Sequence, residues 1–256
     1  MPDFCTVGEQ DGVTIITINR PEVMNSLHPP ANFELDAAVK AFEANPAARV
    51  AIITGAGDRA FSAGNDLKYT AAGHKIEVPD SGFGGLTKNY HRTKPVIAAV
   101  NGVALGGGFE IALACDLIIA SENAIFGLPE PKVGLAALAG GLNRLPRQIG
   151  VKNALGMILT GRHVGAAEGK ALGFVNEVVE SGGALEAALK WAATIAANSP
   201  QSIRTSLDVV MRSLDFASVG DSIDAHYASV DDLRSGPDAV EGPLAFAEKR
   251  KPNWSA

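Results

Sequence analysis

The residues best suited to catalysis are a glutamate and the run of glycines just before it. Gly106, Gly107 and Gly108 are consecutive, and Glu110 closes the stretch Asn101–Glu110. A glycine backbone can adopt positive φ and can approach a ligand closely. At a helix start, the free N–H groups of such glycines lie at the positive end of the helix dipole and favour a developing negative charge. A carboxylate beside them indicates acid/base chemistry on a carbonyl compound.

Two further stretches could complete such a site. Phe61–Lys68 contains a glycine turn, after which the N–H of Asn65 could point toward a ligand. Phe126–Pro131 holds Glu130 between two prolines, which restrict the backbone on both sides of that carboxylate. Taken alone, the three glycines could simply let a helix pack on a strand, and either glutamate could be a solvent-facing or helix-capping residue.

Three apolar runs are expected to be the strands that position these stretches. They are Val50–Gly55, Pro95–Val100 and Asp116–Ala120, and each is followed by turn residues and then by a polar or helical segment. Runs that are apolar throughout indicate strands covered on both faces. The pattern therefore predicts an α/β fold built on a repeated unit of strand, turn and helix.

Other elements surround these strands. Cys5–Glu9 and Val13–Asn19 are expected to pair as a hairpin, and a helix is expected from about residue 30 to residue 44. Later helices are expected at Val151–Thr160, Ala166–Leu172, Ala184–Asn198 and Pro200–Ser213, with a short strand at Phe174–Val179. Tyr69–Leu86 shows no clean period, and we expect a flexible flap there.

Composition excludes several classes of function. The chain has 256 residues, enough for one large domain or for a domain with an extension, and its net charge of −6 disfavours a nucleic-acid surface. Cys5 and Cys115 are its only cysteines and are expected to be thiols in a reducing compartment. We see no secretion signal, no uninterrupted membrane-spanning run, no metal-ligand spacing and no Gly-x-Ser-x-Gly elbow. We expect a cytoplasmic protein with no metal and no membrane or nucleic-acid partner.

The glycine stretch, the Phe61–Lys68 segment and the Pro-Glu-Pro turn, in this order and at these separations, resemble the enoyl-CoA hydratase/isomerase (crotonase) superfamily. The resemblance runs from Asn19–Pro21 to Ala245–Arg250. It implies a crotonase-like spiral of ββα units over residues 1–181. It also implies a C-terminal helical extension over residues 182–256 that packs at the subunit interfaces of a homotrimer or a dimer of trimers. No cofactor is implied, because coenzyme A is part of the substrate.

The resemblance also implies roles for individual residues. The N–H groups of Asn65 and Gly107 would form an oxyanion hole for the thioester oxygen, Glu110 would activate water, and Glu130 would donate a proton to Cα. Contacts with the substrate or its coenzyme A are implied for Val23, Asn25, Leu27, Ala63, Gly64, Asp66, Leu67, Lys68, Gly106, Phe246 and Lys249. The first three could instead belong to a loop that only connects a strand to a helix. Lys68 and Lys249 could simply face water.

The implied reaction is the reversible addition of water to a 2-enoyl-CoA, giving a 3-hydroxyacyl-CoA, a lyase reaction of fatty acid metabolism. A Δ3,Δ2-enoyl-CoA isomerase needs only one base, at the position of Glu130, and stays open. Three segments look closest to the carnitinyl-CoA dehydratase branch: Gly106–Glu110, Phe126–Glu130 and the Glu241–Arg250 tail. A non-catalytic acyl-CoA binder is the alternative from another class. Ala136–Leu138 departs from the usual family loop, so the shape of the acyl pocket cannot be predicted.

Overall fold

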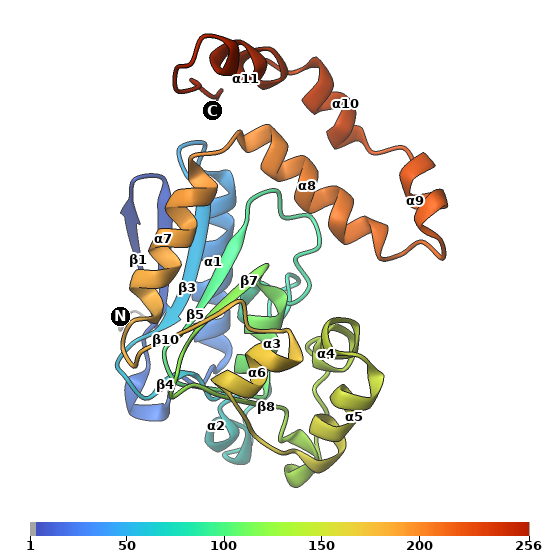
Figure 1. Cartoon of the computed structure of the whole chain (residues 1–256). Helices are drawn as coiled ribbons and strands as arrows, with labels where there is room; N and C mark the ends of the chain where they lie inside the picture. The colour runs from blue at the N-terminus through green and yellow to red at the C-terminus, as the bar shows by residue number, and fades with distance from the viewer. Residues whose placement is uncertain (1–3, 256) are drawn as a thin grey trace.

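A computed structural model describes residues 4–255 and contains two sheets, covered by helices and followed by a helical C-terminal region (Figure 1). The strands are β1 (Cys5–Gln10), β2 (Val13–Ile18), β3 (Val50–Gly55), β4 (Ala60–Ser62), β5 (Val96–Val100), β6 (Val103–Leu105), β7 (Leu117–Ser121), β8 (Ile125–Gly127), β9 (Val164–Gly165) and β10 (Glu177–Val179). Among the described residues, a six-stranded sheet has the order β1-β2-β3-β5-β7-β10. A four-stranded sheet has the order β4-β6-β8-β9.

Helices occupy most of the remaining chain. The α-helices are α1 (Pro29–Ala44), α2 (Leu67–Ala71), α3 (Gly107–Ala114), α4 (Gly141–Ile149), α5 (Val151–Thr160), α6 (Ala166–Leu172), α7 (Ala184–Ala196), α8 (Pro200–Ser213), α9 (Val219–Asp224), α10 (Ala228–Ser235) and α11 (Asp238–Ala247). Short 3-10 helices are η1 (Pro21–Val23), η2 (Phe83–Gly85) and η3 (Glu130–Val133). The sequence predicted α1 and α7 to within a few residues, and α5, α6 and α8 with the bounds that are observed.

The predicted repeat of strand, turn and helix is present. β3, β5 and β7 are parallel neighbours in the large sheet, and each is followed by a short strand, β4, β6 or β8, in the small sheet. β4, β6 and β8 also pair in parallel, so successive turns of the chain stack on one another. The segments that leave these short strands lead to α2, α3 and η3. The spiral therefore brings the three stretches singled out in the sequence to one end of the small sheet.

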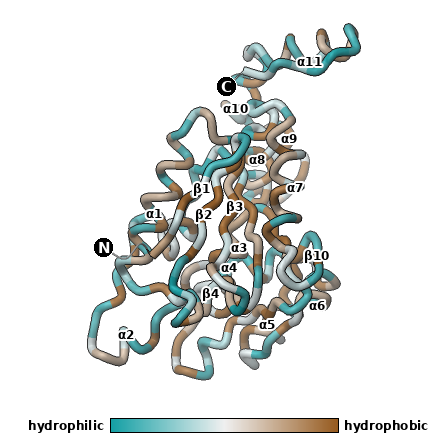
Figure 2. The backbone as a smooth tube through the Cα atoms, turned by 90° about the vertical axis from the view of Figure 1, so that its left-hand side faces the viewer, coloured by the Kyte–Doolittle hydropathy of each residue, from teal (hydrophilic) through white to brown (hydrophobic). Residues whose placement is uncertain are grey.

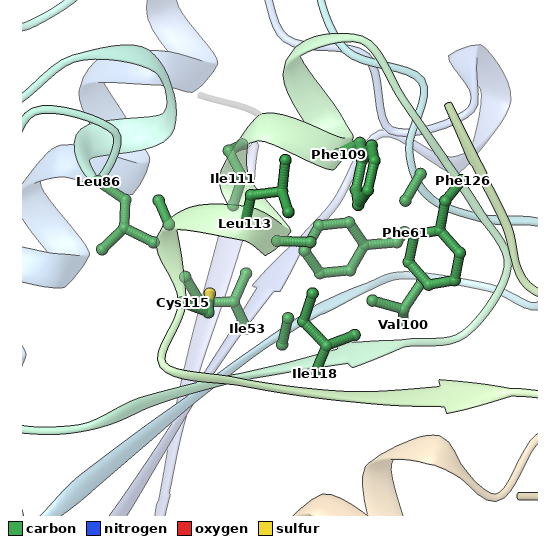
Figure 3. Close-up of a cluster of buried hydrophobic side chains, with 14 of the residues drawn as sticks. Ile53, Phe61, Leu86, Val100, Phe109, Ile111, Leu113, Cys115, Ile118 and Phe126 are labelled. Atoms are coloured by element: carbon green, nitrogen blue, oxygen red, sulfur yellow. The ribbon is translucent and has the colours of Figure 1, made fainter. Parts of the chain in front are cut away.

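Both faces of the large sheet are covered, as its uniformly apolar strands predict. Successive side chains of a strand point to opposite faces. Ile53 lies in a large core with residues of α1 and α3, whereas Ile52 lies in a second cluster with alanines of α7. Figure 2 shows that β2 and β3 carry mostly hydrophobic residues. Beneath α3, the rings of Phe61, Phe109 and Phe126 fill the large core (Figure 3).

The C-terminal helices from α8 onward extend away from the two sheets (Figure 1). They leave large apolar side chains exposed, including Val210, Val219, Ile223 and Phe246. By contrast α7, which begins at Ala184, packs on the large sheet through apolar contacts with β3, β5 and β7. The helical C-terminal region is thus present, and the domain division between residues 181 and 182 stays a prediction.

The expectation of a flap over Tyr69–Leu86 was wrong for its second half. Residues 71–78 are exposed, but Gly82–Thr87 is buried. Asn32 accepts a hydrogen bond from the Gly84 N–H at 2.7 Å, and this contact with α1 draws the segment inward.

None of the helices within residues 4–255 combines the length and the apolar character that a membrane span requires.

Candidate active site

The site is built around the first turn of α3. Gly106 precedes the helix with φ of 53°, a left-handed conformation that favours glycine, and the helix begins at Gly107. A Cβ on Gly106 would lie 3.2 Å from Oε1 of Glu130, so the absence of a side chain lets that carboxyl approach the helix start. A Cβ on Gly108 would lie 2.0 Å from the carbonyl oxygen of Ser62, which shows that this glycine serves close packing.

The two predicted donor segments lie side by side. Gly64 has φ of 86°, and a Cβ there would lie 2.7 Å from the Gly107 nitrogen and 2.6 Å from the Leu105 carbonyl oxygen. The residue after Gly64 is Asn65. Within residues 4–255, neither the Asn65 N–H nor the Gly107 N–H donates a hydrogen bond to another group of the chain. Both amides are therefore free to bind an external acceptor.

Glu110 and Glu130 flank this helix start. Glu110 lies on α3 and is only 4% exposed, and its Oε1 accepts a hydrogen bond of 2.8 Å from the Gly141 N–H at the start of α4. Glu130 begins η3 and is half-buried, and its Oε2 is buried without a hydrogen-bond partner in the described part of the chain. A buried carboxyl oxygen of this kind is suited to a ligand, because an unpaired polar atom is costly to bury.

Burial makes both carboxyls weaker acids than usual. Burial raises the pKa of Glu110 to about 7; the Gly141 N–H opposes this shift and the charge of Glu130 adds to it. The guanidinium of Arg144 also opposes the shift. Burial likewise raises the pKa of Glu130. Near neutral pH, Glu110 is therefore present in both protonation states, which suits a group that takes and returns a proton.

Gly141 is a residue of the candidate site that the sequence reasoning missed. It holds the carboxyl of Glu110 through its N–H, and a Cβ there would lie 3.1 Å from the same Oε1 and 2.9 Å from the Cβ of Ala137. The available signal was the pair Gly140 and Gly141 just before a helix, since a helix start supplies free N–H groups for a carboxylate.

The loop before α1 supports the donor segment from inside the protein. Asn25 is fully buried and accepts a hydrogen bond from the Arg20 N–H at 2.9 Å. Leu27 is also fully buried, and its N–H donates to the Gly64 carbonyl at 2.7 Å, while its carbonyl accepts from the Asp66 N–H at 3.0 Å. The side chains of Asn25 and Leu27 face the interior and are not available to coenzyme A. The backbone of this loop and the partly buried side chain of Val23 remain available for such a contact.

The remaining predicted contact residues are divided between the site and the outer surface. Asp66 forms an ion pair with Arg20 at 3.1 Å, Ala63 is partly buried, and Leu67 and Lys68 are exposed at the start of α2. Phe246, which is 87% exposed, lies on α11, and Lys249 follows that helix. In Figure 1, α11 lies at the far end of the C-terminal helices, well away from α3, so one chain does not bring Phe246 and Lys249 to the glutamates. Their roles stay predictions.

Among residues 4–255 there is no cluster of three His, Cys, Asp or Glu side chains that could hold a metal ion. The groups that the site brings together are two carboxyls and two free main-chain amides. The spiral of ββα units and this site define the class: the chain belongs to the enoyl-CoA hydratase/isomerase family, whose model matches residues 8–256. The resemblance seen in the sequence is thereby confirmed.

Individual relatives indicate which members of the family this chain resembles. Carnitinyl-CoA dehydratase of Escherichia coli (strain K12) is 42% identical over 251 residues, covering 93% of this chain and 93% of that protein. Mevalonyl-coenzyme A hydratase of Beauveria bassiana is 42% identical over 261 residues, covering 96% of this chain and 92% of that protein. The crystal structure of enoyl-CoA hydratase from Mycobacterium tuberculosis H37Rv is 38% identical, with a TM-score of 0.93 over 99% of both chains. The fold and the position near the carnitinyl-CoA dehydratase branch agree with the sequence prediction.

Proposed function

We propose that this protein is an enoyl-CoA hydratase, which adds water reversibly to a 2-enoyl-CoA to give a 3-hydroxyacyl-CoA. The observation that carries the proposal is the placement of two carboxyls, the buried Glu110 and the half-buried Glu130, on either side of a helix start with free N–H groups. Family membership supplies the acyl-CoA class of substrate.

The thioester oxygen binds to the N–H groups of Asn65 and Gly107. As an enolate forms, negative charge moves onto this oxygen, and the two amides stabilise it more strongly than they stabilise the neutral carbonyl. In other enzymes one such donor contributes about 3 to 4 kcal/mol to the transition state. Because both donors are main-chain groups, neither depends on the chemistry of a side chain.

Each of the two carboxyls carries out one proton transfer in the addition of water. Glu110 takes a proton from the water whose oxygen bonds to Cβ, and the C=C electrons move through Cα to the thioester oxygen. Glu130 then delivers its proton to Cα as the enolate collapses. A pKa of about 7 suits Glu110 to the role of general base at neutral pH. Dehydration uses the same groups in reverse.

Three alternatives remain distinct from this proposal. The relatives at 42% identity named carnitinyl-CoA dehydratase favour a dehydratase acting on a 3-hydroxyacyl-CoA with a polar acyl group. A Δ3,Δ2-enoyl-CoA isomerase would use Glu130 alone, and a non-catalytic binder would use neither carboxyl. The burial and raised pKa of Glu110 favour the two-carboxyl reaction over both of these.

We also infer a homotrimer or a dimer of trimers in the cytoplasm. Support for self-association comes from the exposed apolar side chains of the C-terminal helices, such as Val219 and Phe246. Apolar surfaces of this kind mark protein contacts when they are contiguous. In such an assembly, α11 of one subunit could bring Phe246 and Lys249 to the coenzyme A of its neighbour.

The test is hydration of crotonyl-CoA and crotonobetainyl-CoA, followed by the loss of absorbance of the conjugated thioester. Wild-type protein should turn over at least one of them. Glu110→Gln should lower kcat about 10²-fold or more, the usual contribution of a general base, with binding of the thioester retained. Glu180→Gln, which changes an exposed glutamate, is the matched control and should behave as wild type. Equal turnover by Glu110→Gln and wild type would remove Glu110 from the mechanism.

A further inference from the structure

The Gly107 amide has a neighbour that the sequence did not point to. The position that a Cβ on Gly107 would occupy lies 2.4 Å from Cε1 and 2.8 Å from Cζ of Phe83, so the ring rests directly on the Gly107 backbone. On another side of the same residue, Gly64 approaches so closely that its Cβ position is 2.7 Å from the Gly107 nitrogen. The Gly107 backbone is thus held between an aromatic ring and the other donor segment.

Phe83 is itself fixed from several directions. It is 7% exposed, and its N–H donates to the Thr87 hydroxyl at 2.9 Å. The next residue, Gly84, donates its N–H to the Asn32 side chain of α1 at 2.7 Å. A Cβ on Gly84 would meet Cδ1 of Ile111 at 2.6 Å, so this segment also packs on α3, one turn after Gly107.

Two polar side chains tie the ends of the same segment to separate helices. The Ser81 hydroxyl donates to the carboxylate of Asp36 on α1. At the other end, the Arg144 guanidinium of α4 donates to the Thr87 carbonyl at 2.8 Å. The segment from Ser81 to Thr87 is therefore attached to three helices, and Phe83 lies at its centre.

From these contacts we infer that Phe83 is a positioning residue for the oxyanion hole: its ring holds the Gly107 N–H in the direction that the thioester oxygen requires. The inference rests on the proposed function and adds a residue to it. A main-chain donor on glycine has no side chain of its own to anchor it, so neighbouring atoms must set its direction. Catalysis is sensitive to such placement, since a displacement of about 1 Å can reduce a rate about 100-fold.

The experiment compares Phe83→Leu with Phe42→Leu. Phe42 is a buried core phenylalanine on α1, 2% exposed, so its replacement controls for loss of core packing. One readout is kcat and KM for the enoyl-CoA that wild type hydrates. The other is the red shift in absorbance of bound cinnamoyl-CoA, which reports how strongly the carbonyl is polarised. Phe83→Leu should lower kcat about tenfold or more with KM little changed, and it should reduce the red shift. Phe42→Leu should leave both as in wild type.

A double variant tests the contact itself. The nearest atoms to a Cβ on Gly107 all belong to the Phe83 ring. Gly107→Ala alone should therefore displace the helix start, and adding Phe83→Ala should recover part of the lost stability and part of the red shift. Independent, additive effects of the two substitutions would contradict the inference.

The outcomes separate the inference from the function on which it rests. If wild type hydrates enoyl-CoA and Phe83→Leu keeps wild-type kcat and red shift, the inference is wrong and the function stands. If wild type shifts the chromophore without hydrating any enoyl-CoA, the hydratase proposal is wrong, and the effect of Phe83→Leu on the shift still decides the inference. If wild type does neither, both are overturned.

Discussion

Glu110→Gln should lower kcat about 10²-fold or more and should gain stability relative to wild type as the pH rises. The carboxyl of Glu110 has an ordinary pKa of 4.5 and a pKa of about 7 in the folded protein, where burial is the main cause. The folded state therefore binds this proton more tightly than the unfolded state does. Stability from this group is fully present below pH 4.5 and is lost as the pH rises to about 7. The total loss is about 3 kcal/mol, at 1.36 kcal/mol for each pH unit between the two values.

A glutamine cannot ionise, so the variant does not lose folding stability at this position as the pH rises. Any difference in stability between a buried amide and a buried protonated carboxyl at this position does not depend on pH. The quantity to measure is therefore the change with pH in the stability difference between variant and wild type. Urea unfolding from pH 5 to pH 8 should show the difference moving in favour of Glu110→Gln by about 2 to 3 kcal/mol.

Glu180→Gln provides the control, since Glu180 is exposed and its replacement should give a stability difference that is flat with pH. Activity supplies the second half of the prediction. For wild type, kcat/KM for hydration should rise with pH as Glu110 loses its proton near pH 7, and the variant should lack that limb. A stability difference for Glu110→Gln that is constant over this range would refute the reasoning about the buried carboxyl.

Four further substitutions test other parts of the proposal. Gly107→Ala should lower kcat about 10²-fold to 10³-fold in the hydration assay, because its methyl group meets the Phe83 ring and displaces a donor. Asn65→Ala should keep most of the wild-type kcat, since the proposed donor is its main-chain N–H. Glu130→Gln should abolish deuterium exchange at Cα of a bound acyl-CoA, measured by mass spectrometry. Phe246→Ser should weaken self-association, measured by size-exclusion chromatography with light scattering, because an 87% exposed ring is lost.

The architecture was predictable where the apolar pattern was unambiguous. Ile52 and Ile53 point to opposite faces of β3, and both are buried, as a uniformly apolar run indicates. The spiral was not derivable from these runs, since periodicity does not say which strand pairs with which. It followed from the resemblance of the glycine and proline motifs to a known family.

The sequence also singled out the two glutamates and the two glycine segments that the structure brings together, because glycine and proline mark the backbone positions where such groups occur. Their catalytic roles stay predictions. The contact between Glu110 and Gly141 was not found. It joins residues 31 positions apart, and only the packing of α4 against α3 brings them together.

The burial of the segment that follows residue 80 was missed for the same reason. Its glycines predict a loop, but its anchors are Asn32 and Asp36, far earlier in the chain, and Arg144, far later. Asn25 was expected to contact coenzyme A or to lie in a simple connecting loop, and its burial was not predicted. In the fold, that side chain donates to the Ala56 and Ala60 carbonyls at 3.0 and 2.7 Å. Local sequence does not reveal such long-range hydrogen bonds.

The most direct test of the proposed reaction is isotope incorporation from labelled water. The protein is incubated with crotonyl-CoA and with crotonobetainyl-CoA in deuterium oxide enriched in oxygen-18, and the products are analysed by mass spectrometry. Two carboxyls acting on an enolate held by main-chain amides predict oxygen-18 on Cβ and one deuterium on Cα of the same product, and predict that Glu110→Gln loses the oxygen label. Deuterium without oxygen-18, or no label from either substrate, would contradict the account.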